Sequence, residues 1–300
     1  MAIIVLSRGK CGLSKCISCY LLAMAASDLL VVIFAVIFNR IIGIYFPGNK
    51  LSITPICRFK TLLVFATTDT SIWLTVVFTL DRFIAICFHK LKTKYCTESS
   101  AAAIVATVSV LSYIKNIPWY FVLEPLYTLD NLPWYCRIRS IFYTSPLWQA
   151  FSYFCRITTP FLPFVIILLL NALTVRYILV TSKARMVLRG SKGTEKYPDP
   201  EMVNRKKSII LLFSISGNFI LLWLTFTVHY LYYRISNTYS YSGYNDPVYI
   251  LEETGNMLVM LSCCTNTFIY AVNQNRFREE LKKIILYPIY RIATFINNQT

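Results

Sequence analysis

Long apolar stretches separated by short polar segments make up most of this chain of 300 residues. A helix rises about 1.5 Å per residue, so about 20 apolar residues cross the roughly 30 Å hydrocarbon core of a membrane. Residues 1–6 are apolar but too few to span a membrane. Six other stretches are long enough, at residues 17–39, 58–80, 101–122, 150–180, 207–233 and 248–272. The pattern predicts an all-α membrane protein whose spans form a single bundle over residues 1–300.

Lysine and arginine are concentrated in alternate polar segments, which determines the predicted orientation. One side holds most of them, in residues 8–15, 90–94, 183–207 and 276–283. The positive-inside rule puts that side, together with the carboxyl end, in the cytoplasm. Six spans would then place the amino end inside. A first helix of which residues 1–6 are a remnant would instead give seven spans and an outer amino end, and we expect this truncated first helix.

Two cytoplasmic segments differ in their predicted structure. Residues 183–205 contain two glycines and two prolines among charged residues, which is typical of an irregular loop, here the third cytoplasmic loop. Residues 274–287 place apolar side chains at helical spacing among charges. That pattern predicts an amphipathic helix lying on the inner leaflet.

The composition agrees with a membrane protein and disfavours other classes. Hydrophobic residues make up 56% of the chain and charged residues 15%, whereas about a quarter of a soluble domain is charged. The net charge of +16 comes largely from the cytoplasmic clusters beside anionic lipid, and no basic patch interleaved with aromatic residues indicates nucleic acid. With only two histidines, zinc binding gets little support, and no phosphate loop or nucleophile–base pair indicates an enzyme.

Two cysteines are expected on the outer side of the membrane. Cys57 and Arg82 are 25 residues apart, which is about 37 Å along a helix, so they lie at opposite faces. Cys136 follows span 101–122 in a long outer loop, on the same side as Cys57. The oxidising exterior permits a disulfide between Cys57 and Cys136. Two free cysteines are the alternative.

Asp28 lies inside an apolar helix, where a carboxylate is costly and usually faces the bundle interior. Ser71 is expected at a similar depth on the next span, and Ser262 and Asn266 on the last span can add oxygen atoms. Together these residues could hold a hydrated Na⁺ ion or a proton. A structural hydrogen-bond cluster is the simpler interpretation, and the two are compatible. Asp69 is a second intramembrane acid with no assigned role.

The segment Thr79–Cys87, which contains Asp81, Arg82 and Phe83, resembles the inner end of the third helix in rhodopsin-like G-protein-coupled receptors. The resemblance implies a bundle of seven transmembrane helices in the plasma membrane and a heterotrimeric G protein as partner. In that family the acid restrains the arginine at rest. On activation the arginine moves inward to meet the carboxyl-terminal helix of the G-protein α-subunit.

Further motifs of the same family follow in order along the chain. Asp28 resembles the sodium-site acid of the second helix, and Cys57 has the spacing that the family uses for its disulfide. Phe219 and Trp223 resemble the aromatic switch of the sixth helix. The stretch from Asn266 to Tyr270 resembles the Asn-Pro-x-x-Tyr motif of the seventh helix.

The chain departs from the family pattern at two switch prolines. Thr225 stands where the sixth helix normally has its kinking proline, and Thr267 replaces the proline of the seventh helix. Threonine can bend a helix by bonding to an earlier carbonyl, but more weakly. These changes keep open a receptor-like protein that does not signal. A transporter is less favoured, because the intramembrane acids stop at mid-depth.

Within the family, Gly255-Asn256-Met-Leu and three other segments look most like an orphan subgroup whose mammalian members respond to tryptophan and phenylalanine and couple mainly to the Gq class. Val64 occupies the position of the aspartate in amine receptors, so a monoamine ligand is disfavoured. Arg156 could bind the carboxylate of an amino acid or short peptide, and a glutamate could bind the ammonium group of the same ligand. Alternatively, Arg156 extends to the outer interface. The candidate ligand contacts are Val64, Phe65, Thr68, Arg156, Phe226, His229, Tyr230, Glu252, Glu253 and Asn256.

Overall fold

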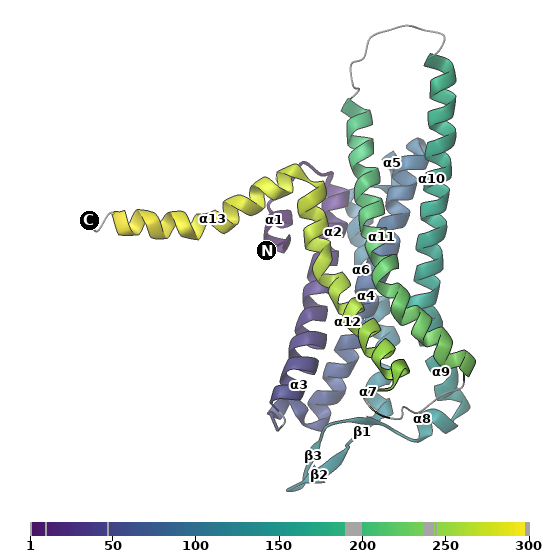
Figure 1. The fold of residues 1–300 in the computed structure, drawn as a ribbon, viewed down its shortest axis with the longest axis vertical. Helices are drawn as coiled ribbons and strands as arrows, with labels where there is room; N and C mark the ends of the chain where they lie inside the picture. Colours follow the sequence, from purple (N-terminus) through teal and green to yellow (C-terminus); the bar gives the residue numbers. More distant parts are fainter. Residues whose placement is uncertain are drawn as a thin grey trace.

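The computed structural model describes residues 2–9, 11–46, 48–189, 200–236, 243 and 245–297. Within these ranges, only the backbone is described for residues 89, 182–189, 200–205, 233–236 and 287–297. The fold is a helical bundle with a small β-hairpin at one end and a lateral helix at the other (Figure 1).

Among the described residues, six helical segments are long and apolar enough to cross a membrane. They run over Lys15–Tyr45, Thr54–Cys87, Glu98–Val122, Pro146–Thr181, Lys206–Tyr232 and Pro247–Asn273. Each of them overlaps one of the six apolar stretches in the sequence. Large apolar side chains such as Leu111, Leu221 and Phe268 are 60–71% exposed on the outside of the bundle. Such exposure suits a surface that faces lipid.

Several of these segments consist of more than one helical element. The first is α2 (Lys15–Val31), the π-helix η1 (Val32–Ile41) and α3 (Ile42–Tyr45), and the second is α4 (Thr54–Cys87). The third is α6 (Glu98–Asn116) with α7 (Pro118–Val122). The fourth is α9 (Pro146–Arg156), the π-helix η3 (Ile157–Phe161) and α10 (Leu162–Arg189). The last two are α11 (Pro200–Ser236) and α12 (Pro247–Asn273).

Shorter elements complete the chain. They are α1 (Ala2–Ser7), η2 (Lys50–Ser52), α5 (His89–Tyr95), α8 (Ile141–Thr144) and α13 (Asn275–Asn297). The predicted remnant at residues 1–6 corresponds to α1, in which Val5 and Leu6 are buried. They belong to an apolar cluster that also contains Tyr20, Tyr270 and Phe277, so α1 is packed against the cytoplasmic end of the bundle.

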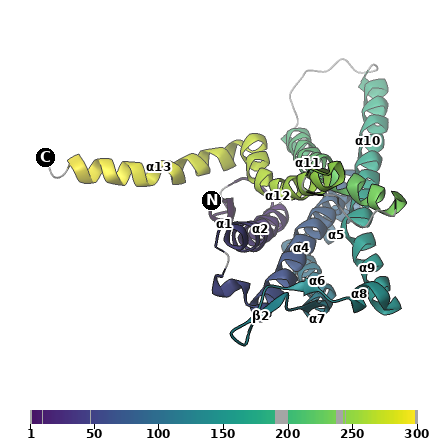
Figure 2. The ribbon, with the colours of Figure 1, turned by 60° about the horizontal axis from the view of Figure 1, so that its bottom comes forward.

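Helix α4 is the central helix of the bundle. It packs against α2, α6, α10 and α11, and Figure 2 shows it running between them. Thr54 begins this helix at the outer end and Cys87 ends it at the inner end. A single side chain on α4 can therefore reach several neighbouring helices, which explains why most of the polar contacts described below include α4.

The outer loop between α7 and α8 forms strands that the sequence did not predict. Strand β2 (Tyr127–Leu129) pairs with β3 (Leu132–Trp134), and β1 (Leu123–Glu124) pairs with β4 (Arg137–Ile138), both antiparallel. Asp130 and Asn131 form the two-residue turn with φ of 50° and 61°. Asp and Asn tolerate this left-handed conformation better than most residues, which favours a tight hairpin.

The hairpin is attached to the outer end of α4. The predicted disulfide between Cys57 and Cys136 is confirmed. Beside it, the Thr54 hydroxyl donates to the Tyr135 carbonyl, and the Tyr135 amide donates to the Ser52 carbonyl, each at 2.7 Å. The loop therefore has a defined position over the outer face of the bundle.

The cytoplasmic segments differ in length from the predictions. The loop predicted at 183–205 is shorter, because α10 continues to Arg189 and α11 begins at Pro200, while residues 190–199 lie outside the described residues. Residues 183–189 contain no glycine or proline, so the helix can continue through them. The amphipathic helix predicted at 274–287 is α13, which extends to Asn297 because apolar residues continue at helical spacing.

Candidate functional site

The arginine of the Asp-Arg-Phe motif lies between α4 and α11 at the inner end of the bundle. Asp81 and Arg82 are both buried, and their side chains form an ion pair. Nη1 of Arg82 also donates a hydrogen bond of 3.3 Å to Oγ of Ser208 on α11. The other carboxylate oxygen of Asp81 accepts a hydrogen bond of 3.4 Å from the Cys16 thiol on α2. The motif therefore connects the inner ends of three helices.

Two further contacts surround this motif. Phe83 packs beside an apolar cluster that includes Leu212, which adds a second connection between α4 and α11. The Cys96 thiol, between α5 and α6, donates to the backbone carbonyl of Asp81 at 3.7 Å. Burial, reinforced by the negative charge of Asp81, raises the pKa of Cys96 to about 12, so the thiol stays protonated at cytosolic pH. The sequence has one Cys-x-x-Cys spacing, at residues 16–19, but no cluster of metal-binding side chains occurs among the described residues.

Asp28 lies in the middle of the bundle and connects three helices. The residue is on α2 and is 4% exposed. One carboxylate oxygen accepts a hydrogen bond of 2.6 Å from Ser71 on α4, and the other accepts one of 2.8 Å from Nδ2 of Asn266 on α12. The structure therefore brings together three residues of the predicted sodium site. The fourth, Ser262, donates its hydroxyl to the Val259 carbonyl of its own helix at 2.7 Å.

A small cavity lies beside this cluster. Its volume of about 10 Å³ is about that of one water-sized particle. Its polar lining comes from Ser71, Thr75, Asn218, Ser262 and Asn266. Asn218, which sequence reasoning missed, accepts a hydrogen bond of 3.1 Å from Thr265 on α12. Asn218 could have been identified from the sequence, because its amide lies in the middle of an apolar span.

The predicted aromatic switch is buried on the side of α11 that faces the core. The rings of Phe219 and Trp223 are stacked, with centroids 5.4 Å apart. They pack in one apolar cluster with residues of α4 and α10. Thr225 and Thr267, at the two missing prolines, lie inside α11 and α12, each of which is one continuous helix. The loss of the prolines therefore leaves both helices unbroken.

Tyr270, the last residue of the seventh-helix motif, is 1% exposed. Its ring lies 6.0 Å from that of Phe277 on α13. The hydroxyl is buried and has no hydrogen-bond partner among the described atoms. This tyrosine therefore joins α12 to α13 through its ring alone.

The candidate ligand contacts on α4 do not all face the same neighbouring helices. Val64 packs beside an apolar cluster of α2 and α12 residues. Phe65, which is 39% exposed, instead lies against α7, with its ring 4.7 Å from that of Trp119. The Thr68 hydroxyl donates to the Val64 carbonyl at 2.7 Å. Neighbouring positions on α4 therefore contact opposite sides of the bundle.

Four other candidates form a polar group at the outer end of the bundle. The Arg156 guanidinium lies over the ring of Tyr230, with Cζ 5.0 Å from the ring centroid. The charges of Glu252 and Arg156 both act on His229, which is 6% exposed. The contact of Arg156 with Tyr230 therefore joins α9 to α11, and Glu252 of α12 lies near enough for its charge to act on His229.

The remaining candidates lie on or against α12. The Glu253 carboxylate already pairs with Arg40 of η1, with Oε2 and Nη1 2.7 Å apart. Asn256 lies about one turn further inward and is half-buried. Phe226 lies at a close approach of α11 and α12, because a Cβ atom on Gly255 would be 3.0 Å from the Phe226 Cα atom. Only glycine permits this close approach without displacement of a helix.

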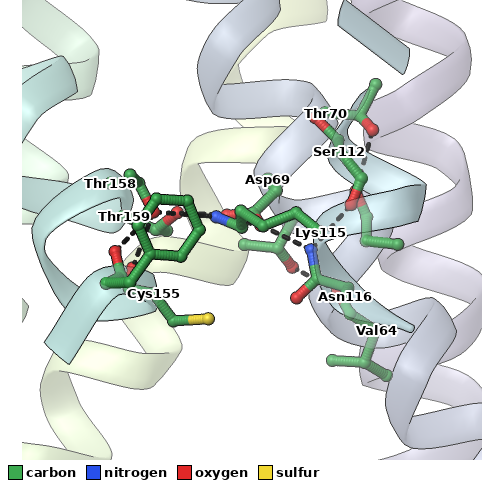
Figure 3. A network of polar contacts seen from close by, with 12 residues as sticks. Val64, Asp69, Thr70, Ser112, Lys115, Asn116, Cys155, Thr158 and Thr159 are labelled. Carbon is green, nitrogen blue, oxygen red and sulfur yellow. Dashed lines mark hydrogen bonds and ion pairs between the residues drawn. The ribbon is translucent and has the colours of Figure 1, made fainter. Parts of the chain in front are cut away.

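Sequence reasoning missed two lysines whose side chains are largely shielded from solvent. Lys60 on α4 is 9% exposed and donates to the Phe38 carbonyl of η1 at 3.4 Å. Lys115 near the end of α6 forms an ion pair with Asp69 of α4 (Figure 3). A lysine inside an apolar stretch was the available signal in both cases. Its partner was not visible, because Asp69 and Lys115 come from different spans.

The comparison with known families agrees with this geometry. The family described as "7 transmembrane receptor (rhodopsin family)" matches residues 1–270. The chain belongs to this family. The predicted fold class, a transmembrane helix bundle, is therefore confirmed, and the chain is a multi-pass protein of the plasma membrane and not an enzyme.

Individual relatives are similar over different shares of the chain. Probable G-protein coupled receptor 142 of Mus musculus is 23% identical over 276 residues, which are 89% of this chain and 64% of that protein. The thyrotropin-releasing hormone receptor of Mus musculus is 31% identical over 125 residues, 41% of this chain and 31% of the relative. The receptor of the same name from Homo sapiens is 30% identical over 125 residues, 41% of this chain and 30% of the relative. The chain thus spans less than two thirds of the length of these relatives.

Proposed function

We propose that this chain is a receptor that binds an extracellular amino acid or short peptide and activates a heterotrimeric G protein of the Gq class. The observation that carries the proposal is the position of Arg82, which is held by Asp81 and by Ser208 of α11 at the cytoplasmic end. Outward movement of α11 would break the Ser208 contact and release the guanidinium towards a partner. A ligand can drive such a change only by binding the two states with different affinities.

The polar group at the outer end supports the proposed ligand class. Arg156 offers a cation to a carboxylate, and Glu252 offers an anion to an ammonium group. The aspartate expected for monoamines is replaced by Val64, which is packed among apolar side chains. A relative named for thyrotropin-releasing hormone favours a peptide ligand. The match to receptor 142 favours the amino-acid subgroup that the sequence resembles.

Neutralising the ligand carboxylate is expected to weaken activation by at least tenfold. The probes are L-tryptophan, L-phenylalanine and short peptides, each as free acid and as carboxamide. Calcium and cyclic AMP are recorded in cells that express the full-length receptor. A hydrogen-bonded charge contributes about 1.5–3 kcal/mol, and about 1.4 kcal/mol corresponds to a factor of ten in affinity. In Arg156→Gln receptors, the concentrations of acid and amide that give half-maximal activation should differ by less than about twofold.

The matched control is Arg139→Gln, an exposed arginine in the outer loop, which should keep the preference for the acid. A cyclic AMP response without calcium release would contradict the Gq assignment. If Arg156→Gln retains the full preference for the acid, Arg156 is not the carboxylate contact. If amides activate as well as acids in the unmodified receptor, the proposed ligand class is wrong.

We also propose that the Asp28 cluster binds Na⁺. Hard cations prefer oxygen ligands, and Asp28, Ser71, Ser262 and Asn266 supply them, the last three beside a cavity that holds one water-sized particle. The bound ion would neutralise the Asp28 carboxylate and stabilise the packing of α2, α4 and α12.

Sodium is expected to raise the melting temperature of the purified receptor by about 3–5 °C relative to potassium at equal ionic strength. An ion at ten times its dissociation constant stabilises the folded state by about 1.4 kcal/mol, and 1 kcal/mol shifts the melting temperature of a chain of this size by about 2–4 °C. Asp28→Asn should remove the difference, whereas Asp69→Asn should retain it. Equal melting temperatures in the two salts would argue against the site.

A further inference from the structure

An ion pair lies at membrane depth between two helices. The Asp69 carboxylate of α4 and the Lys115 ammonium of α6 are 2.5 Å apart, with side chains 5% and 13% exposed. Charges at this depth are costly unless they are paired, and they seldom occur without a role. The Asp-Arg-Phe motif and the Asp28 cluster do not include this pair.

The remaining polar atoms of the pair are also satisfied. Nδ2 of Asn116 donates to Asp69 at 2.6 Å and to the Ser112 carbonyl at 2.8 Å. The Thr159 hydroxyl donates to the second Asp69 oxygen and accepts from Lys115 at 2.9 Å, and Thr158 accepts from Lys115 at 3.2 Å. A network in which both ions have several hydrogen-bond partners holds its members in one arrangement. Figure 3 shows it extending from α4 and α6 to the two threonines.

The two threonines lie in η3, where the helix is irregular. Thr159 has φ of −150° and ψ of 108°, which is extended rather than helical. The backbone leaves the helical conformation at this residue, and the following Pro160 has no amide to donate, so side-chain contacts help to hold the segment in place. The network supplies them from α4 and α6. Thr159 is therefore the attachment point of η3.

The attachment point lies between two residues that contact α11. Arg156, one turn before Thr159, lies over the Tyr230 ring at 5.0 Å. Phe161, two residues after Thr159, has its ring 5.3 Å from that of Tyr230. A displacement of η3 would therefore change both contacts together. The chain of contacts runs from Asp69 and Lys115 through Thr159 to Tyr230 on α11.

We propose that Asp69, Lys115 and Thr159 form a polar lock that positions Arg156 and Phe161 against Tyr230. The three are positioning residues, because they act on the ligand through Arg156 without contacting it. The effect on ligand recognition rests on the proposed function. The effect on the position of η3 does not, so the two can be tested separately.

The position of η3 is measured by disulfide trapping in membranes that contain the full chain. Cysteines replace Phe161 and Tyr230, an oxidant is added, and the specific cross-link is followed by mass spectrometry, which separates it from the native cysteines. Thr159→Val, which keeps the shape but removes the hydroxyl, should slow this cross-link at least fivefold. The charge-free pair Asp69→Asn with Lys115→Met should do the same.

A second cysteine pair is the matched control. Asn218 and Thr265 are hydrogen-bonded between α11 and α12 and do not touch the network. With cysteines at these two positions, the lock variants should change the cross-linking rate by less than twofold. If the lock variants slow cross-linking of both cysteine pairs, they loosen the whole bundle, and the specific positioning is refuted. An unchanged rate at 161–230 in Thr159→Val also overturns it, even if the charge variants fail to reach the membrane.

Ligand recognition is then compared in the same variants, with the native residues at 161 and 230. Thr159→Val should reduce the preference for the free acid over the amide at least threefold, and Lys50→Met, an exposed lysine at the outer face, should not. If cross-linking behaves as expected but no variant or ligand gives Arg82-dependent signalling, the lock is supported and the proposed function fails. Normal signalling with an unchanged cross-linking rate would instead support the proposed function and refute the lock.

Discussion

Replacement of Arg82 by alanine is expected to reduce ligand-driven signalling at least tenfold, with surface expression within about twofold of the unmodified receptor. Alanine is the best helix former, so α4 should stay helical to Cys87. The substitution removes the guanidinium that links α4 to Ser208 of α11. That guanidinium is also the group proposed to meet the G protein. The measurement is the calcium response at matched amounts of receptor on the cell surface.

Arg8→Ala is the control for this prediction. Arg8 is another arginine on the cytoplasmic side, but it is exposed and lies outside the motif, so its loss should leave the response within about twofold. Full coupling by an Arg82→Ala receptor would show that the G-protein mechanism proposed for this chain is wrong. A loss that merely parallels lower surface expression would indicate a folding role for Arg82.

The second large effect is expected from the loss of the disulfide. Cys57 and Cys136 are 79 residues apart in sequence, and a cross-link that closes a loop of this order stabilises a fold by about 2–5 kcal/mol. The double variant Cys57→Ser with Cys136→Ser should therefore melt at least about 5 °C lower in a thermal unfolding experiment. The hairpin would keep only its hydrogen bonds to the outer end of α4.

The exposed free cysteine Cys264 supplies the control. Cys264→Ser should unfold at the temperature of the unmodified receptor, and a reducing agent should lower that temperature only where the disulfide is present. Equal melting temperatures for the double variant and the unmodified receptor would mean that the hydrogen bonds at Ser52 and Thr54 suffice to hold the loop.

The spans could be predicted because lipid imposes a local rule. Every backbone amide in hydrocarbon must be satisfied within its own segment, so an apolar stretch of sufficient length is a helix whatever its neighbours are. The motif residues were found differently, because the segment around Asp81 and Arg82 resembles a known family. The proposed roles of these residues, of the ligand contacts and of the sodium site remain predictions.

The outer hairpin and the two π-helices were not predicted. Strands of two or three residues have too few positions for an alternating pattern. The irregular backbone of η3 occurs at Thr159, where the following Pro160 disfavours helical dihedrals, but the sequence does not show which partners Thr159 meets across the bundle. Partners 47 and 90 residues from Asp69 leave no periodic trace in a single sequence.

The sequence by itself predicted the six spans from local hydropathy and their orientation from the charged segments, and its resemblance to a known family identified the Asp-Arg-Phe motif and suggested the membership. Only the tertiary structure decided which polar groups meet. In the folded chain, Asp28 accepts hydrogen bonds from Ser71 and Asn266. Glu253 forms an ion pair with Arg40, and Asp69 forms one with Lys115. The physical reason is that a buried charge must find its counter-charge in three dimensions, and helix packing, not chain order, selects that partner.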